Sequence, residues 1–147
     1  MATSIPNSFL GRLAGDTAQI STAINFATDT FKLMLLDSNH TTDIDAQVFI
    51  DDVSANEVAA SGDYTTGGVA LTLTGSTDDT NDLGKLDAVD ISLDTVTTSA
   101  AYAVVYKDTG TPSTSPIIGI YDCVVTSTLG TLSITINASG LLTIAQA

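Results

Sequence analysis

Apolar and polar residues alternate with a period of two along much of this chain. The alternation is clearest at residues 69–74, which follow a double glycine, Gly67 and Gly68. A period of two is that of a half-buried β-strand, here with valine and leucines on one face and alanine and threonines on the other. Glycine tolerates positive φ and close backbone approach, so we expect a bulge or tight corner where this strand begins.

Similar patterns predict seven further strands, at residues 17–26, 31–36, 86–93, 100–107, 117–121, 131–136 and 142–144. Residues 31–36 are largely apolar on both faces, which places this strand centrally in its sheet. The turn-rich link 108–116 holds Gly110, Pro112 and Pro116 and predicts a long hairpin between the strands beside it. Residues 137–140 predict a second hairpin at the end of the chain. Residues 75–84 are predicted to form a polar loop.

One segment has the period of a helix. Ala46, Phe49, Ile50 and Val53 recur at i, i+3, i+4 and i+7, which predicts a short amphipathic helix.

The first 16 residues lack a regular period, although they contain four large apolar side chains. An arm that docks on a neighbour fits this spacing better than an internal strand, and a short helix through Phe9, Leu10 and Leu13 is the alternative. The four apolar residues of this arm are Ile5, Phe9, Leu10 and Leu13.

Together these patterns predict an all-β protein. About eight strands and one short helix favour an antiparallel β-sandwich or a flattened barrel. We expect residues 1–16 to form the N-terminal arm and residues 17–147 to form a single β domain.

The amino-acid composition is that of a folded domain, and it argues against some classes of binding partner. The 147 residues are 44% hydrophobic and 14% charged, so the chain needs a core. The net charge of −13, with four Lys and Arg in total, argues against nucleic acid and anionic membranes as partners. The same charge would keep the protein soluble at high local concentration.

The N-terminus and the single cysteine bear on location. No basic, continuously apolar leader and no run of roughly 20 apolar residues is present, so we expect a protein that is folded in a cytoplasm and does not span a membrane. Cys123 stands alone, so no intrachain disulfide forms. We expect an inert thiol on a strand, and an intermolecular bridge is the alternative.

Catalytic chemistry has little support in the sequence. His40 is the one histidine, it lies in a polar connection, and we expect it to be solvated. No Gly-x-Ser-x-Gly motif surrounds a serine and no phosphate-binding loop is present, so we expect no enzymatic activity and no cofactor.

A hard-cation site is the best metal candidate. Asp78, Asp79, Asn81 and Asp82 offer oxygen ligands that suit calcium. The spacing of an EF-hand loop is not met and no glutamate closes the set, so we expect a solvated, mobile loop and no metal.

Six segments between Ile24 and Asp122 resemble, in the same order, a family of small proteins encoded among the virion genes of tailed phages. They read INFATDTFKLMLL (24–36), FIDDVSANEV (49–58), GDYTTGGVAL (62–71), DAVDISL (87–93), AYAVVYKDTG (101–110) and IIGIYD (117–122).

The resemblance implies a structural role in the virion, as a capsid decoration (cement) protein on the outer surface of the head, with a place in the tail as the alternative. It brings no catalytic residues, and it makes Tyr64, Gly67 and Gly68 a turn that defines the fold rather than a ligand site. The implied partners are further copies of the chain, with a trimer favoured, and the major capsid protein. The protein would be made in the host bacterial cytoplasm, and the arm with Ile5, Phe9, Leu10 and Leu13 would reach a neighbour or the shell.

A carbohydrate-binding or receptor-binding β module, such as a fibre tip, is a further alternative. Sugar binding usually needs exposed aromatic rings, and this chain has no Trp and 5% aromatic residues. The available rings are Tyr64, Tyr102, Tyr106 and Tyr121; for Tyr102 and Tyr106, which share a strand face, core packing or an oligomer contact is the more common role.

Overall fold

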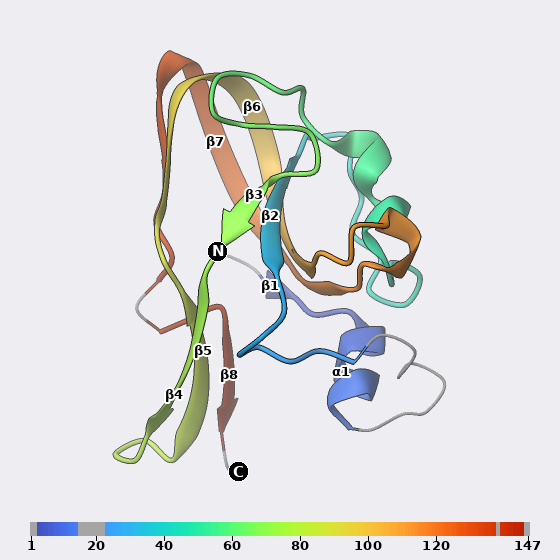
Figure 1. The fold of residues 1–147 in the computed structure, drawn as a ribbon, viewed down its shortest axis with the longest axis vertical. Helices are drawn as coiled ribbons and strands as arrows, with labels where there is room; N and C mark the ends of the chain where they lie inside the picture. Colours follow the sequence, from blue (N-terminus) through green and yellow to red (C-terminus); the bar gives the residue numbers. More distant parts are fainter. Residues whose placement is uncertain (1–2, 15–22, 138, 146–147) are drawn as a thin grey trace.

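A computed structural model describes residues 3–14, 23–137 and 139–145 (Figure 1). This part of the chain forms eight strands in two antiparallel sheets. The five-stranded sheet has the order β1-β7-β6-β2-β3, and the three-stranded sheet has the order β4-β5-β8. The two sheets do not close on each other, so the prediction of an all-β sandwich is confirmed and a barrel is not formed.

The strands are β1 (Thr3–Ser4), β2 (Phe31–Leu36), β3 (Val69–Leu71), β4 (Leu73–Asp78), β5 (Leu83–Ala88), β6 (Ile91–Lys107), β7 (Ile117–Ile134) and β8 (Leu142–Ala145). The helical elements of the described residues are α1 (Asn7–Leu13) and the 3₁₀ turns η2 (Ile50–Asp52), η3 (Ser54–Asn56) and η4 (Pro112–Thr114).

Strand β2 lies where its sequence predicts, in the interior of the larger sheet. It pairs with β6 along its whole length and with β3 over Phe31–Leu33. Five of its six residues are buried, because core packs against both of its faces. Phe31, Leu33 and Leu35 join the core cluster that contains Phe9, whereas Met34 and Leu36 join a second cluster beneath η2.

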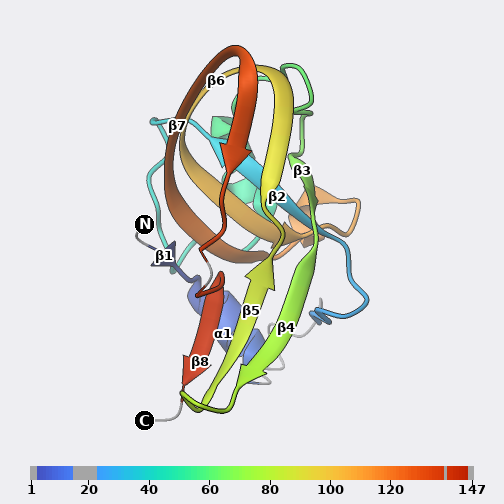
Figure 2. The ribbon, with the colours of Figure 1, turned by 90° about the vertical axis from the view of Figure 1, so that its left-hand side faces the viewer.

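The predicted long hairpin is confirmed, and it is longer than the sequence indicates. Strands β6 and β7, of 17 and 18 residues, pair from Tyr106↔Ile117 to Ile91↔Ile134. Their register shifts at four places, and Thr95 and Leu129 have positive φ. Such bulges increase the twist of a ribbon. The ribbon bends strongly in Figure 2, and it includes the strands predicted at 100–107 and 117–121 and part of that at 131–136.

Two predicted strands are divided between the sheets. The alternation at residues 69–74 is confirmed, but β3 ends at Leu71 and β4 begins at Leu73 in the other sheet. The strand predicted at 86–93 is divided in the same way, after Ala88. Val89 is 60% exposed, and its backbone N–H donates to the carbonyl of Thr72, so the two divisions lie side by side.

The polar loop predicted at residues 75–84 is wrong for most of its length. β4 and β5 form a hairpin whose register is unbroken from Leu73↔Ala88 to Asp78↔Leu83. The hairpin closes because one oxygen of the Asp78 carboxylate accepts the backbone N–H groups of Thr80 and Asn81. A short turn closed by the side chain of Asp78 therefore stands where the polar composition had predicted a long loop.

The helix predicted from Ala46 to Val53 is also wrong in type. Residues 50–56 form the 3₁₀ turns η2 and η3, although Ile50 and Val53 are buried as expected. Phe49 has extended dihedral angles and is the N-cap of η2, because the Asp52 carboxylate accepts the N–H groups of Val48 and Phe49 and the helical turn begins only at Ile50. The α-helix of the described chain is α1, within the N-terminal segment.

The ends of the predicted domain differ from expectation. Of the strand predicted at 17–26, residues 17–22 lie outside the described residues, and residues 23–26 form no strand. β8 was expected to pair with the strand that precedes it, but it pairs with β5, from Leu83↔Ala145 to Leu86↔Leu142. Gly140 has positive φ and turns the chain at this point, where Leu141 donates its N–H to the carbonyl of Leu86.

Candidate interaction surface

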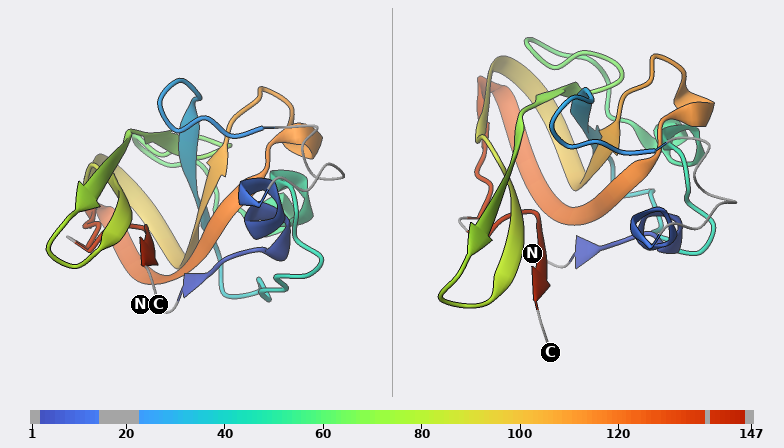
Figure 3. Two further views of the ribbon diagram at one scale, coloured as in Figure 1. Left: turned by 90° about the horizontal axis from the view of Figure 1, so that it is seen from below. Right: turned by 60° about the horizontal axis from the view of Figure 1, so that its bottom comes forward.

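The N-terminal segment that was expected to reach a neighbour is folded onto its own chain. β1 pairs with β7 through Thr3↔Tyr121, and α1 follows (Figure 3). Phe9 has no exposed surface, and its ring packs edge-on against Phe26 with the centroids 6.4 Å apart. Ile5 is half-buried against the same cluster. Ile5 and Phe9 therefore contribute to the core of this chain.

Leu10 and Leu13 remain accessible on the same helix. They are 48% and 47% exposed, and a separation of three residues places both on one side of α1. The helix is held in place at its start, where the N–H of Asn7 donates to the carbonyl of Ile44 at 3.0 Å and its side chain donates to Asp45. The two leucines are thus an apolar pair on an anchored element.

Arg12, in the last turn of α1, anchors the other end of the helix. Its guanidinium carbon lies 5.3 Å from the centroid of the Phe49 ring, within the range of a cation–π contact. Burial lowers the pKa of Arg12 from its usual value, and the group remains charged because that value is so high.

An apolar groove of about 240 Å³ lies between the end of α1 and the smaller sheet. Its walls include Leu13, Phe26 and Ile144, and Ile144 is 62% exposed. Gly75 and Gly84 lie at the sheet side of the groove, and a Cβ built on Gly75 would meet no atom within 4 Å. Leu13 is therefore continuous with an apolar surface on the smaller sheet.

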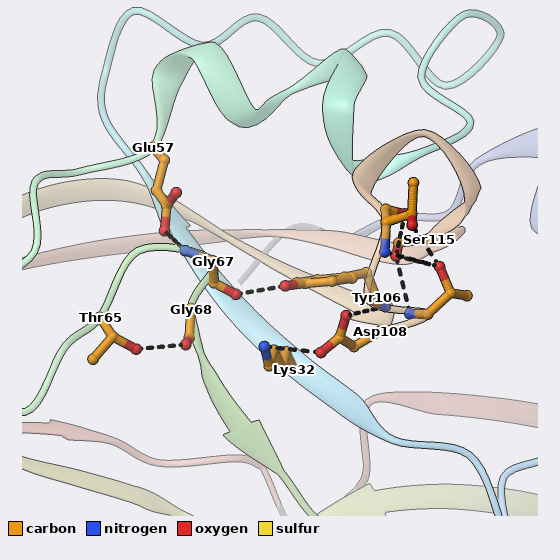
Figure 4. A network of polar contacts seen from close by, with 11 residues as sticks. Lys32, Glu57, Thr65, Gly67, Gly68, Tyr106, Asp108 and Ser115 are labelled. Carbon is orange, nitrogen blue, oxygen red and sulfur yellow. Dashed lines mark hydrogen bonds and ion pairs between the residues drawn. The ribbon is translucent and has the colours of Figure 1, made fainter.

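Hydrogen bonds connect the turn predicted at Tyr64, Gly67 and Gly68 to the rest of the larger sheet. Figure 4 shows the part of this network formed by Glu57, Gly67 and Tyr106. Oε1 of Glu57, the one glutamate of the chain, accepts the hydroxyl of Tyr64 at 2.9 Å and the backbone N–H of Gly67 at 2.7 Å. The carbonyl of Gly67 accepts the hydroxyl of Tyr106. Burial raises the pKa of both tyrosines far above the usual value, so both hydroxyls remain protonated donors.

The double glycine meets the expectation of positive φ and close backbone approach. Gly67 and Gly68 have φ of +88° and +80°. A Cβ on Gly68 would lie 2.3 Å from the carbonyl oxygen of Leu33, so no larger residue fits here without movement of β2. Sequence reasoning missed the role of Glu57, and the available signal was a lone glutamate ten residues before the glycines, in a chain whose other acids are aspartates.

All four basic side chains of the protein are engaged within the chain. Arg12 lies over Phe49, and the three lysines form ion pairs: Lys32–Asp108 at 2.8 Å, Lys107–Asp29 at 2.9 Å and Lys85–Asp87 at 3.7 Å. The surface that remains for a partner is therefore acidic.

Two of these ion pairs lower the pKa of the aspartate. Partial burial alone would raise the pKa of Asp29, but hydrogen bonds from the Asn25 N–H and from Lys107 outweigh it, and the pKa is lowered. The hydrogen bond from Lys32, followed by that from the N–H of Gly110, lowers the pKa of Asp108.

In the candidate cation loop, the Asp78 carboxylate forms hydrogen bonds with other residues of the loop. The Asp78 carboxylate accepts bonds from Asn81 and Thr80, and the Asn81 side chain is the main reason that its pKa is lowered. Within residues 3–14, 23–137 and 139–145, no group of three or more His, Cys, Asp and Glu side chains is placed to hold a metal ion.

His40 is not solvated, contrary to the sequence prediction. It is 4% exposed and packs edge-on against Tyr102, with ring centroids 5.1 Å apart. Burial lowers its pKa, although nearby Asp37 acts in the opposite direction. Tyr102 lies on β6, far from His40 in sequence, so the composition of the loop around His40 could not predict this contact.

Cys123 lies on β7 as expected and is 5% exposed. Burial raises the pKa of its thiol. A protonated, covered thiol is a poor nucleophile.

The tyrosines do not form an exposed aromatic platform. Tyr64, Tyr106 and Tyr121 are buried, and the hydroxyl of Tyr121 donates to the carbonyl of Leu141. Tyr102 is half-buried against His40.

Comparison with protein-family models, with curated proteins and with solved structures finds no match for this chain. Within the part of the chain that the structure describes, no helix is long and apolar enough to cross a membrane.

Proposed function

We propose that this protein is a non-enzymatic structural component of a tailed-phage virion, a decoration protein that binds the outer surface of the head as a homo-oligomer. The proposal starts from the resemblance of residues 24–122 to phage virion proteins. It extends to the major capsid protein as the partner and to the capsid surface as the location.

The observation that supports it best is the apolar pair on α1. Leu10 and Leu13 are each about half exposed on a helix that Phe9, Asn7 and Arg12 fix to the body of the protein. A partner that covers them gains apolar burial without first ordering the helix, which reduces the entropic cost of binding.

Two further observations fit a scaffold better than the alternatives. The acidic surface, with every basic side chain engaged, disfavours nucleic acid. Because three of the four tyrosines are buried, the chain offers little aromatic surface to a sugar, so a carbohydrate-binding module is a weaker proposal.

Multivalency makes weak single contacts sufficient for such a role. Copies linked in an oligomer bind a repeating shell with an effective concentration that far exceeds that of free subunits. The proposal therefore requires no deep pocket.

The experiment is co-sedimentation of the purified protein with empty phage heads and, separately, with isolated tails. We expect binding to heads, lost in the double variant Leu10→Asp/Leu13→Asp. Val124→Asp is the matched control, because Val124 is an 85% exposed apolar residue on β7, outside α1. Binding to tails but not heads would move the protein to the alternative place in the virion, and binding to neither would contradict the proposal.

Removal of the whole N-terminal segment is a poorer test. It would delete Phe9 from the core together with the exposed leucines, so loss of binding and loss of folding would coincide.

A further inference from the structure

We infer that β4, one of the two edge strands of the smaller sheet, pairs antiparallel with β4 of a second copy of this chain. This contact extends each three-stranded sheet into a continuous six-stranded one. The inference does not depend on the proposed place in the virion, because it concerns the isolated protein.

Among the residues that the structure describes, β4 is the longest edge strand with unbroken register, and it has none of the usual protection. Edge strands are normally kept from pairing by short length, proline, lysine, bulges or a cover. β1, β3 and β8 have two, three and four residues, and the edge of β7 belongs to a ribbon whose register shifts four times. β4 has six residues, Leu-Thr-Gly-Ser-Thr-Asp, in unbroken register with β5. In both views of Figure 3 the β4–β5 hairpin projects from the rest of the molecule.

The hydrogen-bond pattern identifies which backbone groups face outward. The Val89 N–H donates to the Thr72 carbonyl, so this is a hydrogen-bonded pair, one step before Leu73↔Ala88. Such pairs alternate with non-bonded pairs along an antiparallel ladder. The N–H groups that face the open edge are therefore those of Leu73, Gly75 and Thr77.

These outward groups are self-complementary about a two-fold axis at Gly75. In that register Gly75 pairs with Gly75 of the second copy, and Leu73 pairs with Thr77 of the second copy. Three hydrogen-bonded pairs supply roughly six backbone hydrogen bonds. The side chains beside the axis are small, and the space next to Gly75 is open.

Charge selects the antiparallel arrangement. The hairpin tip carries Asp78, Asp79 and Asp82, and a parallel pair of strands would bring two such tips together. In the antiparallel register Asp78 faces Thr72 of the second copy, and the two Asp78 residues are about 20 Å apart at roughly 3.4 Å per residue. This exceeds twice the screening length of about 8 Å in physiological salt.

The contact is small, so association will depend on concentration. One six-residue strand buries far less than the roughly 1,600 Å² of a standard interface. We expect a monomer–dimer equilibrium in dilute solution, displaced toward the dimer at high protein concentration.

Sedimentation velocity over a range of concentrations tests the inference. We expect a species of twice the 15.0 kDa chain mass that Gly75→Pro removes, because proline eliminates the central outward N–H. Ser76→Ala is the control, since it changes a neighbouring side chain and leaves the outward N–H groups intact. A protein that stays monomeric at every concentration, or an oligomer such as a trimer that Gly75→Pro leaves unchanged, would overturn the inference without affecting head binding.

Cysteine trapping keeps the inference testable if Gly75→Pro disturbs folding. Thr74 and Ser76 of the second copy form a non-hydrogen-bonded pair, whose Cβ atoms lie roughly 4.5 to 5.5 Å apart. Mixed Thr74→Cys and Ser76→Cys proteins should therefore cross-link to each other in excess over Thr74→Cys with itself. Equal cross-linking of all combinations, or none, would contradict the proposed register.

Discussion

The phenolic oxygen of Tyr64 lies 3.0 Å from the backbone nitrogen of Leu35, although 29 residues separate the two in sequence. The carbonyl of Leu35 accepts the N–H of Val58 from the same returning segment. β3 covers β2 only as far as Leu33, so this segment satisfies the backbone of β2 beyond the end of its neighbouring strand. The stretch from Glu57 to Tyr64 therefore completes the edge of the larger sheet.

Tyr64→Phe should destabilise the protein by about 1 to 3 kcal/mol, because it leaves the buried Leu35 N–H without an acceptor. Urea denaturation followed by circular dichroism measures the loss. Tyr102→Phe is the control, since Tyr102 is half-buried and its contact with His40 is made by the ring. If the two variants were equally stable, a water molecule would be accepting the Leu35 N–H in the Tyr64→Phe protein.

Gly68→Ala should cost roughly 2 to 5 kcal/mol, combining the strain of positive φ with the overlap of a Cβ and the Leu33 carbonyl. Gly110→Ala has the same φ of +80° but open space around its Cβ, so only the strain of roughly 1 to 2 kcal/mol applies. Thermal denaturation of the pair separates the two contributions. A difference near zero between the variants would remove close approach from the explanation.

Phe9→Ala should destabilise the fold by about 3 to 5 kcal/mol, as for other buried phenylalanines. Leu10→Ala, one residue along the same helix, should change stability far less because its side chain is half exposed. Chemical denaturation of both proteins checks this. If Phe9→Ala were as stable as Leu10→Ala, α1 would not dock on its own chain in solution.

Acid should weaken the protein partly through Asp29 and Asp108. The pKa of each is lowered in the folded state, so the folded protein binds fewer protons than the unfolded chain, whose aspartates titrate near 3.9. Their contribution is complete above about pH 4 and is lost as pH falls through the folded values. We expect Asp29→Asn/Asp108→Asn to be less stable than the parent at pH 7 and to lose less stability between pH 5 and pH 2. Parallel stability curves for the two proteins over this range would contradict it.

The Cys123 thiol should react slowly with a chromogenic disulfide reagent at pH 8 in the native protein, and rapidly in denaturant. Its burial and raised pKa both reduce the accessible thiolate. Rapid reaction of the folded protein would show that β7 opens locally at this position.

The sequence identifies elements whose environment is local. Residues 31–36 are apolar on both faces and form the interior strand β2. Gly67 and Gly68 are side by side and adopt positive φ. The link 108–116 is rich in turn residues and joins β6 to β7. In each case the residue types within the segment are enough to predict its structure.

The sequence fails where a distant partner decides the structure. Residues 94–99 and 126–131 are mostly polar, yet they belong to β6 and β7, because each strand supplies the other's hydrogen bonds and the turn at Ser61 and Asp63 bonds to the outer side of β6. β8 pairs with β5 rather than with its predecessor, and period alone gives no pairing partner. The accessible leucines of α1 could not be separated from Phe9 for the same reason, since only the fold shows which side of the helix is covered.

The pairing of β1 with β7 has a consequence for biosynthesis. Thr3 and Ser4 are translated long before their partners Tyr121 and Ile120. Until β7 is made, the Phe9 side chain consequently lacks part of its core cluster, which includes Cys123 and Leu132. The N-terminal segment can therefore pair with its sheet only after β7 has been made.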